Sequence, residues 1–241
     1  MDKEFDFKEL DEEGLENLEA ITEADKFNEW MYDTISSHCT GKILEVGSGI
    51  GNISQFFIRD NADITLTDIR DNYLEALSDR FPTTLQEKID LVHPDFEDLY
   101  AGHLGQYDSI FALNVVEHIK DDKTAMSNIK KLLKKKGKVV ILVPAFQTLY
   151  NVLDKELYHY RRYTSKSLNN IFQVNDIKIL KTHFFNAMGI PAWFIAGKLQ
   201  GEKTIKKSKM RFYNMMVPVF KVFDFPMKKI AGLSVICIGE K

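Results

Sequence analysis

The chain has 241 residues, of which 44% are hydrophobic, and a formal net charge of −3. This length and composition suit one globular α/β domain with additions, and the near-balanced charge argues against a general nucleic-acid binder. The two cysteines, Cys39 and Cys237, stand in no metal-binding spacing, so we expect no metal site and a reduced, cytoplasmic protein. We also expect neither a signal peptide nor a membrane-spanning helix, which would need roughly 18–20 consecutive apolar residues.

Charge is distributed unevenly along the chain. Residues 1–25 contain eleven acids and two lysines, whereas residues 198–229 contain nine basic residues and two acids. Two solvated helical faces would produce this pattern. A basic lobe that meets an anionic substrate or a membrane surface would produce it too.

The first predicted elements are a long helix and a strand that ends in glycines. Residues 8–38 have apolar side chains at helical spacing, and the apolar run 42–46 predicts a buried parallel strand. A turn with Gly47, Gly49 and Gly51 follows, and then a helix over 51–60. Such a turn can hold a nucleotide-like ligand at the helix N-terminus. A dinucleotide fingerprint would need its third glycine at position 52, where this chain has asparagine.

Two further strands are each followed by an acid. The alternating, β-branched segment 62–68 ends in Asp68, which can accept hydrogen bonds from ribose hydroxyls or cap the helix predicted over 70–80. The segment 88–92 is predicted as the third strand. Asp95 follows it and can contact a ligand or cap the next helix.

The central part of the chain completes the predicted sheet. A nearly continuous apolar strand over 107–114 ends in Asn114. An amphipathic, lysine-rich helix is predicted over 122–134, with Gly137 as its end, and a fifth strand over 139–143. Five strands alternating with helices predict a doubly wound parallel α/β sheet, whose ligands bind at the carboxyl ends of the strands.

These motifs together resemble those of class I S-adenosylmethionine-dependent methyltransferases. The resemblance lies in the E-x-G-x-G-x-G turn, in Asp68 and in the sequence Asn-Val-Val-Glu-His-Ile over 114–119. It implies a seven-stranded, mostly parallel sheet with the last strand antiparallel, and S-adenosylmethionine as cofactor, with S-adenosylhomocysteine as product. Asp95 would hold the adenine amine, and Phe96 would offer its N–H to the ring. The implied cofactor residues are Glu45, Gly47, Ser48, Gly49, Gly51, Asp68, Ile69, Asp95, Phe96 and Asn114.

The second half of the chain should contain the acceptor site. Residues 158–164 combine tyrosines, arginines and a histidine, which suits recognition of carboxylate or phosphate, although a structural loop would also fit. This segment resembles a bacterial subgroup of methyltransferases often found with glycosyltransferases of surface-polysaccharide synthesis. The expected substrate-binding residues are Tyr158, Arg161, Arg162, Tyr163 and Asn186.

Strands six and seven are predicted over 177–186 and 233–239, and the 187–232 segment between them forms a helical cap. The cap is rich in Phe, Met and Lys, so it is either an ordinary packed cap or a lid that faces lipid or acceptor. We expect a single methyltransferase domain over 1–241. It comprises a helical N-terminal extension over 1–40, a cofactor half over 41–144 and a substrate half over 145–241.

The predicted activity is methyl transfer to oxygen of a small-molecule, sugar or lipid-linked acceptor, with no nucleic-acid partner. His118 or His159 would act as general base, and Glu117 would orient a histidine or touch substrate. Peripheral contact with the inner face of the membrane would occur through the cap. The alternatives are N-methylation of an amine, a non-catalytic S-adenosylmethionine-binding protein, and a nicotinamide-dependent oxidoreductase, which would need the missing fingerprint.

Overall fold

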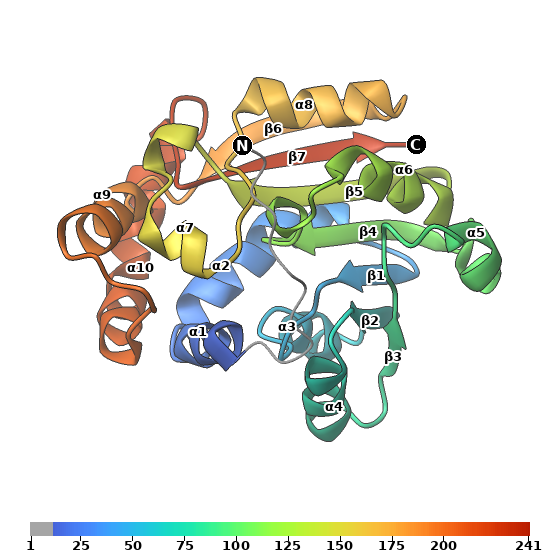
Figure 1. The fold of residues 1–241 in the computed structure, drawn as a ribbon, viewed down its shortest axis with the longest axis horizontal. Helices are drawn as coiled ribbons and strands as arrows, with labels where there is room; N and C mark the ends of the chain where they lie inside the picture. Colours follow the sequence, from blue (N-terminus) through green and yellow to red (C-terminus); the bar gives the residue numbers. More distant parts are fainter. Residues whose placement is uncertain (1–11) are drawn as a thin grey trace.

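The structure is a computed structural model that describes residues 12–241 (Figure 1). Within this range, seven strands form one sheet in the order β3-β2-β1-β4-β5-β7-β6. Strand β7 is antiparallel to both neighbours, and all other pairs are parallel, so the predicted fold class is confirmed. The strands are β1 (Ile43–Val46), β2 (Ile64–Asp68), β3 (Leu85–Lys88), β4 (Tyr107–Leu113), β5 (Leu133–Pro144), β6 (Lys178–Phe185) and β7 (Ser234–Glu240).

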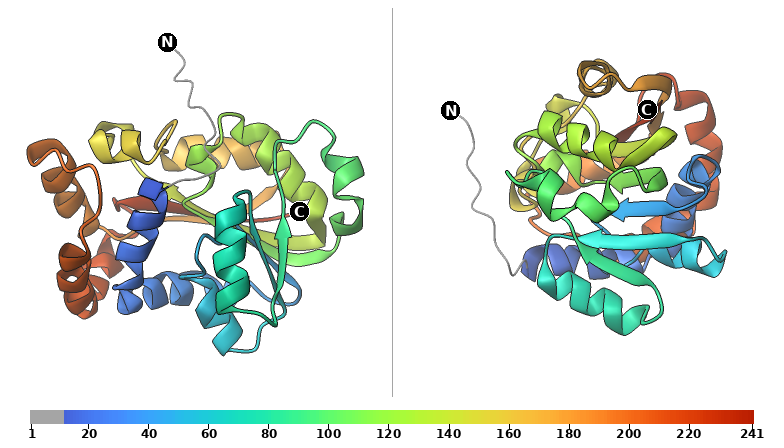
Figure 2. Two further views of the ribbon diagram at one scale, coloured as in Figure 1. Left: turned by 60° about the horizontal axis from the view of Figure 1, so that its bottom comes forward. Right: turned by 90° about the vertical axis from the view of Figure 1, so that its right-hand side faces the viewer.

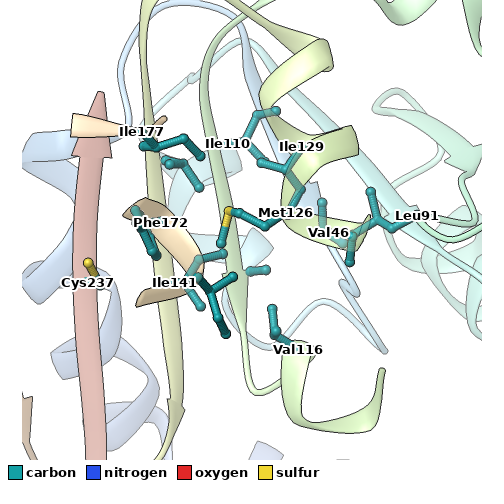
Figure 3. Packing of buried hydrophobic residues seen from close by; sticks show 14 of the residues in the cluster. Val46, Leu91, Ile110, Val116, Met126, Ile129, Ile141, Phe172, Ile177 and Cys237 are labelled. Atoms are coloured by element: carbon teal, nitrogen blue, oxygen red, sulfur yellow. The ribbon is translucent and has the colours of Figure 1, made fainter. Parts of the chain in front are cut away.

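Helices cover both faces of the sheet (Figures 1 and 2). They are α1 (Glu12–Thr22), α2 (Asp25–Ile35), α3 (Ser54–Arg59), α4 (Asp71–Arg80), α5 (Phe96–Leu99), α6 (Asp122–Leu132), α7 (Val152–Glu156), α8 (Ser165–Val174), α9 (Gly189–Phe194) and α10 (Lys207–Met227). One core lies against α6 and α8 and includes Met126 and Phe172 (Figure 3). The other lies against α2, α3 and α10 and includes Trp30 and Val217. Burial on both faces explains the apolar central strands.

The predicted helix over 8–38 is broken. It forms α1 and α2, with the break at Glu23 and Ala24, and residues 8–11 lie outside the described part of the chain. The side-chain amide of Asn28 donates to the Ile21 carbonyl (3.0 Å), which satisfies a carbonyl at the end of α1. A side chain of the second helix thus stabilises the end of the first.

Strand β3 begins three residues earlier than predicted. It pairs with β2 through residue 88, and the chain then leaves the sheet. Ile89 and Leu91 are buried in the core instead, and the amide of Asn128 in α6 donates to the Leu91 carbonyl (2.8 Å). The alternating apolar pattern over 88–92 therefore marks a buried turn.

The lysine-rich segment after α6 was assigned to the wrong element. It belongs to β5, because Leu133 pairs with Tyr107 of β4 and is fully buried. The backbone takes the left-handed conformation at Lys136, with φ of 65°, one residue before Gly137, the predicted end of the helix. Burial of one leucine thus ends the helix before Gly137.

The described part of the acidic segment, from residue 12 onward, faces the basic segment (Figure 2). Helix α10 runs beside α1 and α2, and exposed ion pairs join them. The pairs are Glu19–Lys207 (3.0 Å), Glu23–Arg211 (2.9 Å) and Asp33–Lys221 (3.2 Å). Each exposed pair stabilises by only about 0–1 kcal/mol. They show that part of the basic charge of the cap is paired within the protein, at side chains that remain largely exposed to solvent.

Candidate active site

The glycine-rich turn lies between β1 and α3, at the carboxyl edge of the sheet. Gly47 has φ of 69°, and a Cβ there would clash with Val115, just beyond β4. Only glycine allows this close approach. Ser48 fixes the turn to β2, because its N–H donates to the Thr67 carbonyl (2.8 Å) and its hydroxyl accepts from the Thr67 N–H (3.1 Å).

Two buried carboxyl groups stand beside this turn. The Ser54 hydroxyl donates to Glu45, and burial raises the pKa of Glu45 to about 7. Asp68 accepts from the N–H groups of Gly49 (3.0 Å) and Arg70 (3.1 Å), and burial raises its pKa. Carboxylate oxygens accept several hydrogen bonds, so Asp68 keeps capacity for ligand hydroxyls. Half-buried Ile69 follows Asp68 directly.

Helix α1 covers the glycine turn. The Asn52 amide donates to the Leu18 carbonyl (2.9 Å), and its oxygen accepts from the Thr22 hydroxyl (3.0 Å). A Cβ at Gly49 would stand 3.0 Å from the Leu18 side chain. The asparagine that replaces the third fingerprint glycine therefore docks a helix onto the turn.

The predicted adenine contact lies in the segment between β3, which ends at Lys88, and α5. Asp95 is exposed, seven residues beyond the strand, and the buried Phe96 begins α5. Asp90 lies two residues beyond the strand, half-buried, and accepts from the Val92 N–H (2.9 Å). Asp90 is thus a second carboxylate in this segment, and the adenine contact of Asp95 and Phe96 stays a prediction.

Strand β4 delivers the next residues to this edge. Asn114 turns the chain with φ of 55°, a conformation that asparagine tolerates, and its N–H donates to the Leu142 carbonyl (2.8 Å). A short helix, Val116–His118, follows and carries Glu117. The turn and this helix therefore bring Asn114, Glu117 and His118 to the edge that holds the glycine turn.

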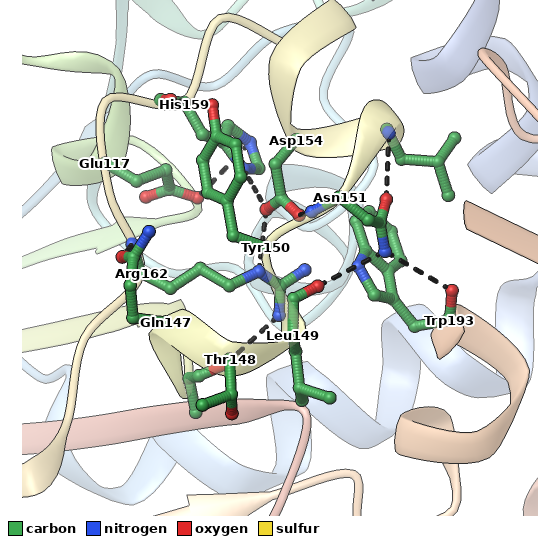
Figure 4. Close-up of polar contacts among 12 residues, drawn as sticks. Glu117, Gln147, Thr148, Leu149, Tyr150, Asn151, Asp154, His159, Arg162 and Trp193 are labelled. Atoms are coloured by element: carbon green, nitrogen blue, oxygen red, sulfur yellow. Dashed lines mark hydrogen bonds and ion pairs between the residues drawn. The ribbon is translucent and has the colours of Figure 1, made fainter. Parts of the chain in front are cut away.

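Glu117, His118 and His159 form a side-chain cluster there. Figure 4 shows Glu117 and His159 of this cluster beside Asp154 and Arg162. The two imidazole rings meet edge to face, with centroids 4.7 Å apart. His159 Nδ1 lies 2.9 Å from Asp154 of α7, and its Nε2 lies 4.0 Å from Glu117. Arg162 Nε lies 2.7 Å from the same Asp154 oxygen. Glu117 and His159 are buried, whereas His118 is exposed.

Burial is the main cause of the pKa shifts in this cluster. It raises the pKa of Glu117 to about 8 and lowers the pKa of His159, although Asp154 opposes that shift. His118 reaches solvent, but the protein around it, with the charges of His159 and Arg70, lowers its pKa well below the ordinary value. Both imidazoles are therefore neutral near pH 7 and can accept a proton or a cation.

Three predicted substrate residues have protein partners instead. Arg162 is buried, pairs with Asp154 and donates to the Ala145 carbonyl (3.1 Å). Arg161 contacts Asp122 (2.6 Å) and the Lys120 carbonyl (2.7 Å). Tyr163 is buried with its hydroxyl on the same Asp122 oxygen (2.9 Å). These contacts favour the structural alternative for this loop, and substrate contacts at the three positions stay predictions.

Asn186 also has a structural role, and the substrate contact predicted for it stays untested by these contacts. It is buried at the end of β6, and its side-chain oxygen accepts from the Tyr213 hydroxyl and from the Gly189 N–H (2.9 Å). It thereby ties the cap to the sheet. Tyr158, half-buried with φ of 59°, stays a predicted acceptor contact.

Sequence reasoning missed Asp90, Asn52 and Asp154. Asp154 lies five residues before His159 and forms a capping box with Asn151, so its sequence signal was that of an ordinary helix start. Nothing in the pattern showed that its other oxygen faces a histidine. Asp90 was hidden by the misplaced third strand.

Comparisons with known proteins agree with this geometry. Residues 44–139 match the family described as a methyltransferase domain. The ubiquinone biosynthesis O-methyltransferase of Psychrobacter cryohalolentis is 33% identical over 101 residues, 42% of this chain and 39% of that protein. The probable polyketide synthase 42 of Dictyostelium discoideum is 28% identical over 141 residues, 48% of this chain and 5% of that protein. The chain thus spans well under two thirds of the length of either relative.

Solved structures show the same fold. A SAM-dependent methyltransferase from Archaeoglobus fulgidus superposes with a TM-score of 0.58 at 15% identity, covering 89% of this chain and 94% of that one. Phosphoethanolamine N-methyltransferase 2 of Haemonchus contortus, solved with S-adenosyl-L-methionine, gives 0.58 at 16% identity, covering 89% and 52%.

Residues 44–139 therefore match a methyltransferase domain, and the chain has the fold of S-adenosylmethionine-dependent methyltransferases of known structure. This matched segment contains the glycine turn, Asp68 and the Glu117–His118 pair. His159 and its partner Asp154 lie beyond it, in the second half of the chain.

Proposed function

We propose that the chain transfers a methyl group from S-adenosylmethionine to an acceptor oxygen bound beside His118. One observation carries this proposal: the glycine turn, Asp68 and the Glu117–His118 segment converge at the carboxyl ends of β1, β2 and β4. This is the edge where doubly wound sheets bind their ligands. In this proposal, the 41–144 half binds the donor and the 145–241 half shapes the acceptor site.

The residues present fit S-adenosylmethionine. Asp68 would accept from the ribose hydroxyls, since its carboxylate is already oriented by two backbone N–H groups. Glu45 would lie near the amino group of the methionine part. Asp95 would hold the adenine amine and Phe96 would offer its N–H to the ring, with the half-buried Asp90 as an alternative carboxylate. Asn114 and the backbone of the glycine turn would complete the site.

The chemistry required of the protein is alignment and proton removal. S-adenosylmethionine supplies a methyl group on a good leaving group, the sulfonium. The acceptor oxygen forms a bond to the methyl carbon, the carbon–sulfur bond breaks with its electron pair on sulfur, and the acceptor loses its proton. The acceptor passes this proton to the Glu117–His118–His159 cluster, whose exposed member is His118. His159 is a positioning residue held by Asp154.

The acceptor atom is tested with a labelled methyl group. The protein is incubated with S-adenosylmethionine carrying a ¹³C methyl and with a glycolipid extract of bacterial envelope, and the extract is examined by ¹³C NMR. Methoxyl carbon in the product, absent with heat-inactivated protein, supports oxygen transfer. N-methyl carbon would instead establish the amine alternative.

We further propose that the acceptor is lipid-linked and that the cap touches the membrane. Among the described residues no helix is long and apolar enough to cross a bilayer. Many large apolar side chains of the cap are nevertheless exposed, close in sequence to Lys228 and Lys229. They include Val222 (70%), Phe223 (57%), Phe225 (77%) and Ile230 (66%). Apolar residues flanked by lysines suit the interface of an anionic membrane.

Vesicle sedimentation tests this contact. We expect the protein to pellet with phosphatidylglycerol vesicles, and the double variant Phe223→Ser/Phe225→Ser to remain in the supernatant. The control Leu85→Ser removes an equally exposed apolar side chain from β3 and should pellet like the wild type. Equal sedimentation of the double variant and the wild type would exclude the cap as the contact.

A further inference from the structure

Glu117 is buried without a hydrogen-bond partner. Its side chain has no solvent exposure, and neither carboxylate oxygen is hydrogen-bonded. Such burial is costly, because the carboxyl group loses its water and gains no replacement. Oε1 faces Nε2 of His159 at 4.0 Å. The carboxyl group of Glu117 and Nε2 of His159 therefore face each other without a hydrogen bond.

A hydrogen bond at one ring nitrogen orients each of the two imidazole rings. His159 Nδ1 lies 2.9 Å from Asp154, so Nδ1 carries the proton and Nε2 keeps its lone pair. Arg162 and the Asn151 N–H hold Asp154 in turn. His118 is hydrogen-bonded to the backbone of Leu157, which leaves its other ring nitrogen as an acceptor. Metal-binding histidines are oriented in this way by a carboxylate or carbonyl.

We propose that Glu117, His118 and His159 bind one divalent transition-metal ion. One ligand atom from each residue lies within 4.8 Å of the other two. Two imidazole nitrogens and one carboxylate oxygen are a donor set that suits Zn²⁺ in sites that keep a further position open. The cation would supply the partner that the buried carboxylate lacks.

Binding requires a small closure of the cluster. Bonds of about 2.0–2.2 Å place tetrahedral ligand atoms about 3.3–3.6 Å apart, which is closer than the present separation. His118 is exposed and can rotate inward. The buried Glu117 and His159, now 4.0 Å apart, must also approach each other slightly.

The role of the ion rests on the proposed function, whereas its binding rests on this geometry. The exposed His118 places the open position on the solvent side of the cluster. A hydroxyl oxygen bound there would pass its proton to water more readily, because the cation stabilises the alkoxide. His118 would then act as a ligand and not as the base itself.

Zn²⁺ alone is the probe in the test. The purified protein is stripped with a chelator, and Zn²⁺ binding is measured by competition with a chromogenic chelator. We expect one ion per chain. Affinity should fall about tenfold or more in His118→Asn and in Glu117→Gln, in line with the loss of one ligand from a small site. Co²⁺ should give visible absorption bands that each variant alters.

The control His93→Asn removes a histidine outside the cluster and should bind Zn²⁺ like the wild type. His118 is exposed, so its variant should fold, and circular dichroism checks this. Absence of stoichiometric Zn²⁺ binding would overturn the proposal. Glu117 would then be buried as a protonated, neutral carboxylic acid. Equal affinity in the wild type and in folded His118→Asn and Glu117→Gln would also overturn it, because the ion would then bind elsewhere.

Binding of S-adenosylmethionine, measured on the stripped protein, separates this proposal from the proposed function. Zn²⁺ binding without S-adenosylmethionine binding would leave the metal site standing and remove the methyltransferase role. S-adenosylmethionine binding without Zn²⁺ binding would leave the methyltransferase role standing and remove the metal site.

Discussion

Glu45 is a buried carboxyl group whose protonation a bound cation would change. Its pKa is raised by burial to about 7, so it is largely neutral just below that pH. The ammonium group of S-adenosylmethionine would favour the ionised form, and binding would release a proton. Affinity should therefore weaken as the pH falls below about 7. Calorimetry in buffers of different ionisation enthalpy should show proton release, and Glu45→Gln should abolish it. Identical enthalpies in all buffers would contradict the proposed place of Glu45.

His183 on β6 should make folding sensitive to acid. It is buried, its Nδ1 has no partner, and burial, with Lys181 and Lys228, lowers its pKa from 6.5 to about 4. Between these two pH values the unfolded chain binds the proton more readily, so stability falls as the pH is lowered. The loss reaches about 3 kcal/mol at the acid end. Urea unfolding at both ends of the window should show a smaller loss in His183→Leu. An unchanged difference would exclude this histidine as the cause.

The role of a residue was predictable where the order of secondary-structure elements fixes its position. Gly47 and Ser48 lie where expected because a strand, a tight turn and a helix follow one another in sequence. Arg162 was not predictable as a structural residue, because its partner Asp154 looks like an ordinary helix start. Residue type shows what a side chain can bind, but only the fold shows whether a protein group already occupies it.

Helix α1 is an element whose position depends on one asparagine. Asn52→Ala should remove both hydrogen bonds to α1, weakening its docking by about 1–2 kcal/mol. Hydrogen exchange should accelerate over residues 14–22, and S-adenosylmethionine affinity should fall because Leu18 covers Gly49. The control Asn170→Ala changes an exposed asparagine of α8 and should alter neither. Unchanged exchange in Asn52→Ala would show that α1 is held by its apolar face instead.

The strand order was predictable, but several boundaries were not. Alternation of strands and helices identified the doubly wound sheet. The element boundaries predicted near Leu91 and Leu133 were wrong because tertiary contacts bury both leucines. Leu91 packs under α6, and Leu133 lies beside Tyr107. The pairing of α10 with α1 and α2 joins residues nearly two hundred positions apart, and composition alone indicated the two charges without indicating that they meet.

The complete molecule combines two segments into one site. The sheet brings Glu117, just beyond β4, against His159, which follows α7. The first lies in the matched methyltransferase segment and the second in the half that we assign to the acceptor. Neither half alone contains the cluster, so acceptor chemistry in this account is a property of the whole chain.

Binding of S-adenosylmethionine is the most direct test of this account. Isothermal titration should give a dissociation constant on the order of micromolar, about −8 kcal/mol, and no binding of NADH. Asp68→Ala should weaken binding about a hundredfold, because two hydrogen bonds to a carboxylate are lost. Well-folded wild-type protein that binds NADH, or that binds no S-adenosylmethionine, would contradict the central claim that this edge of the sheet is a methyl-donor site.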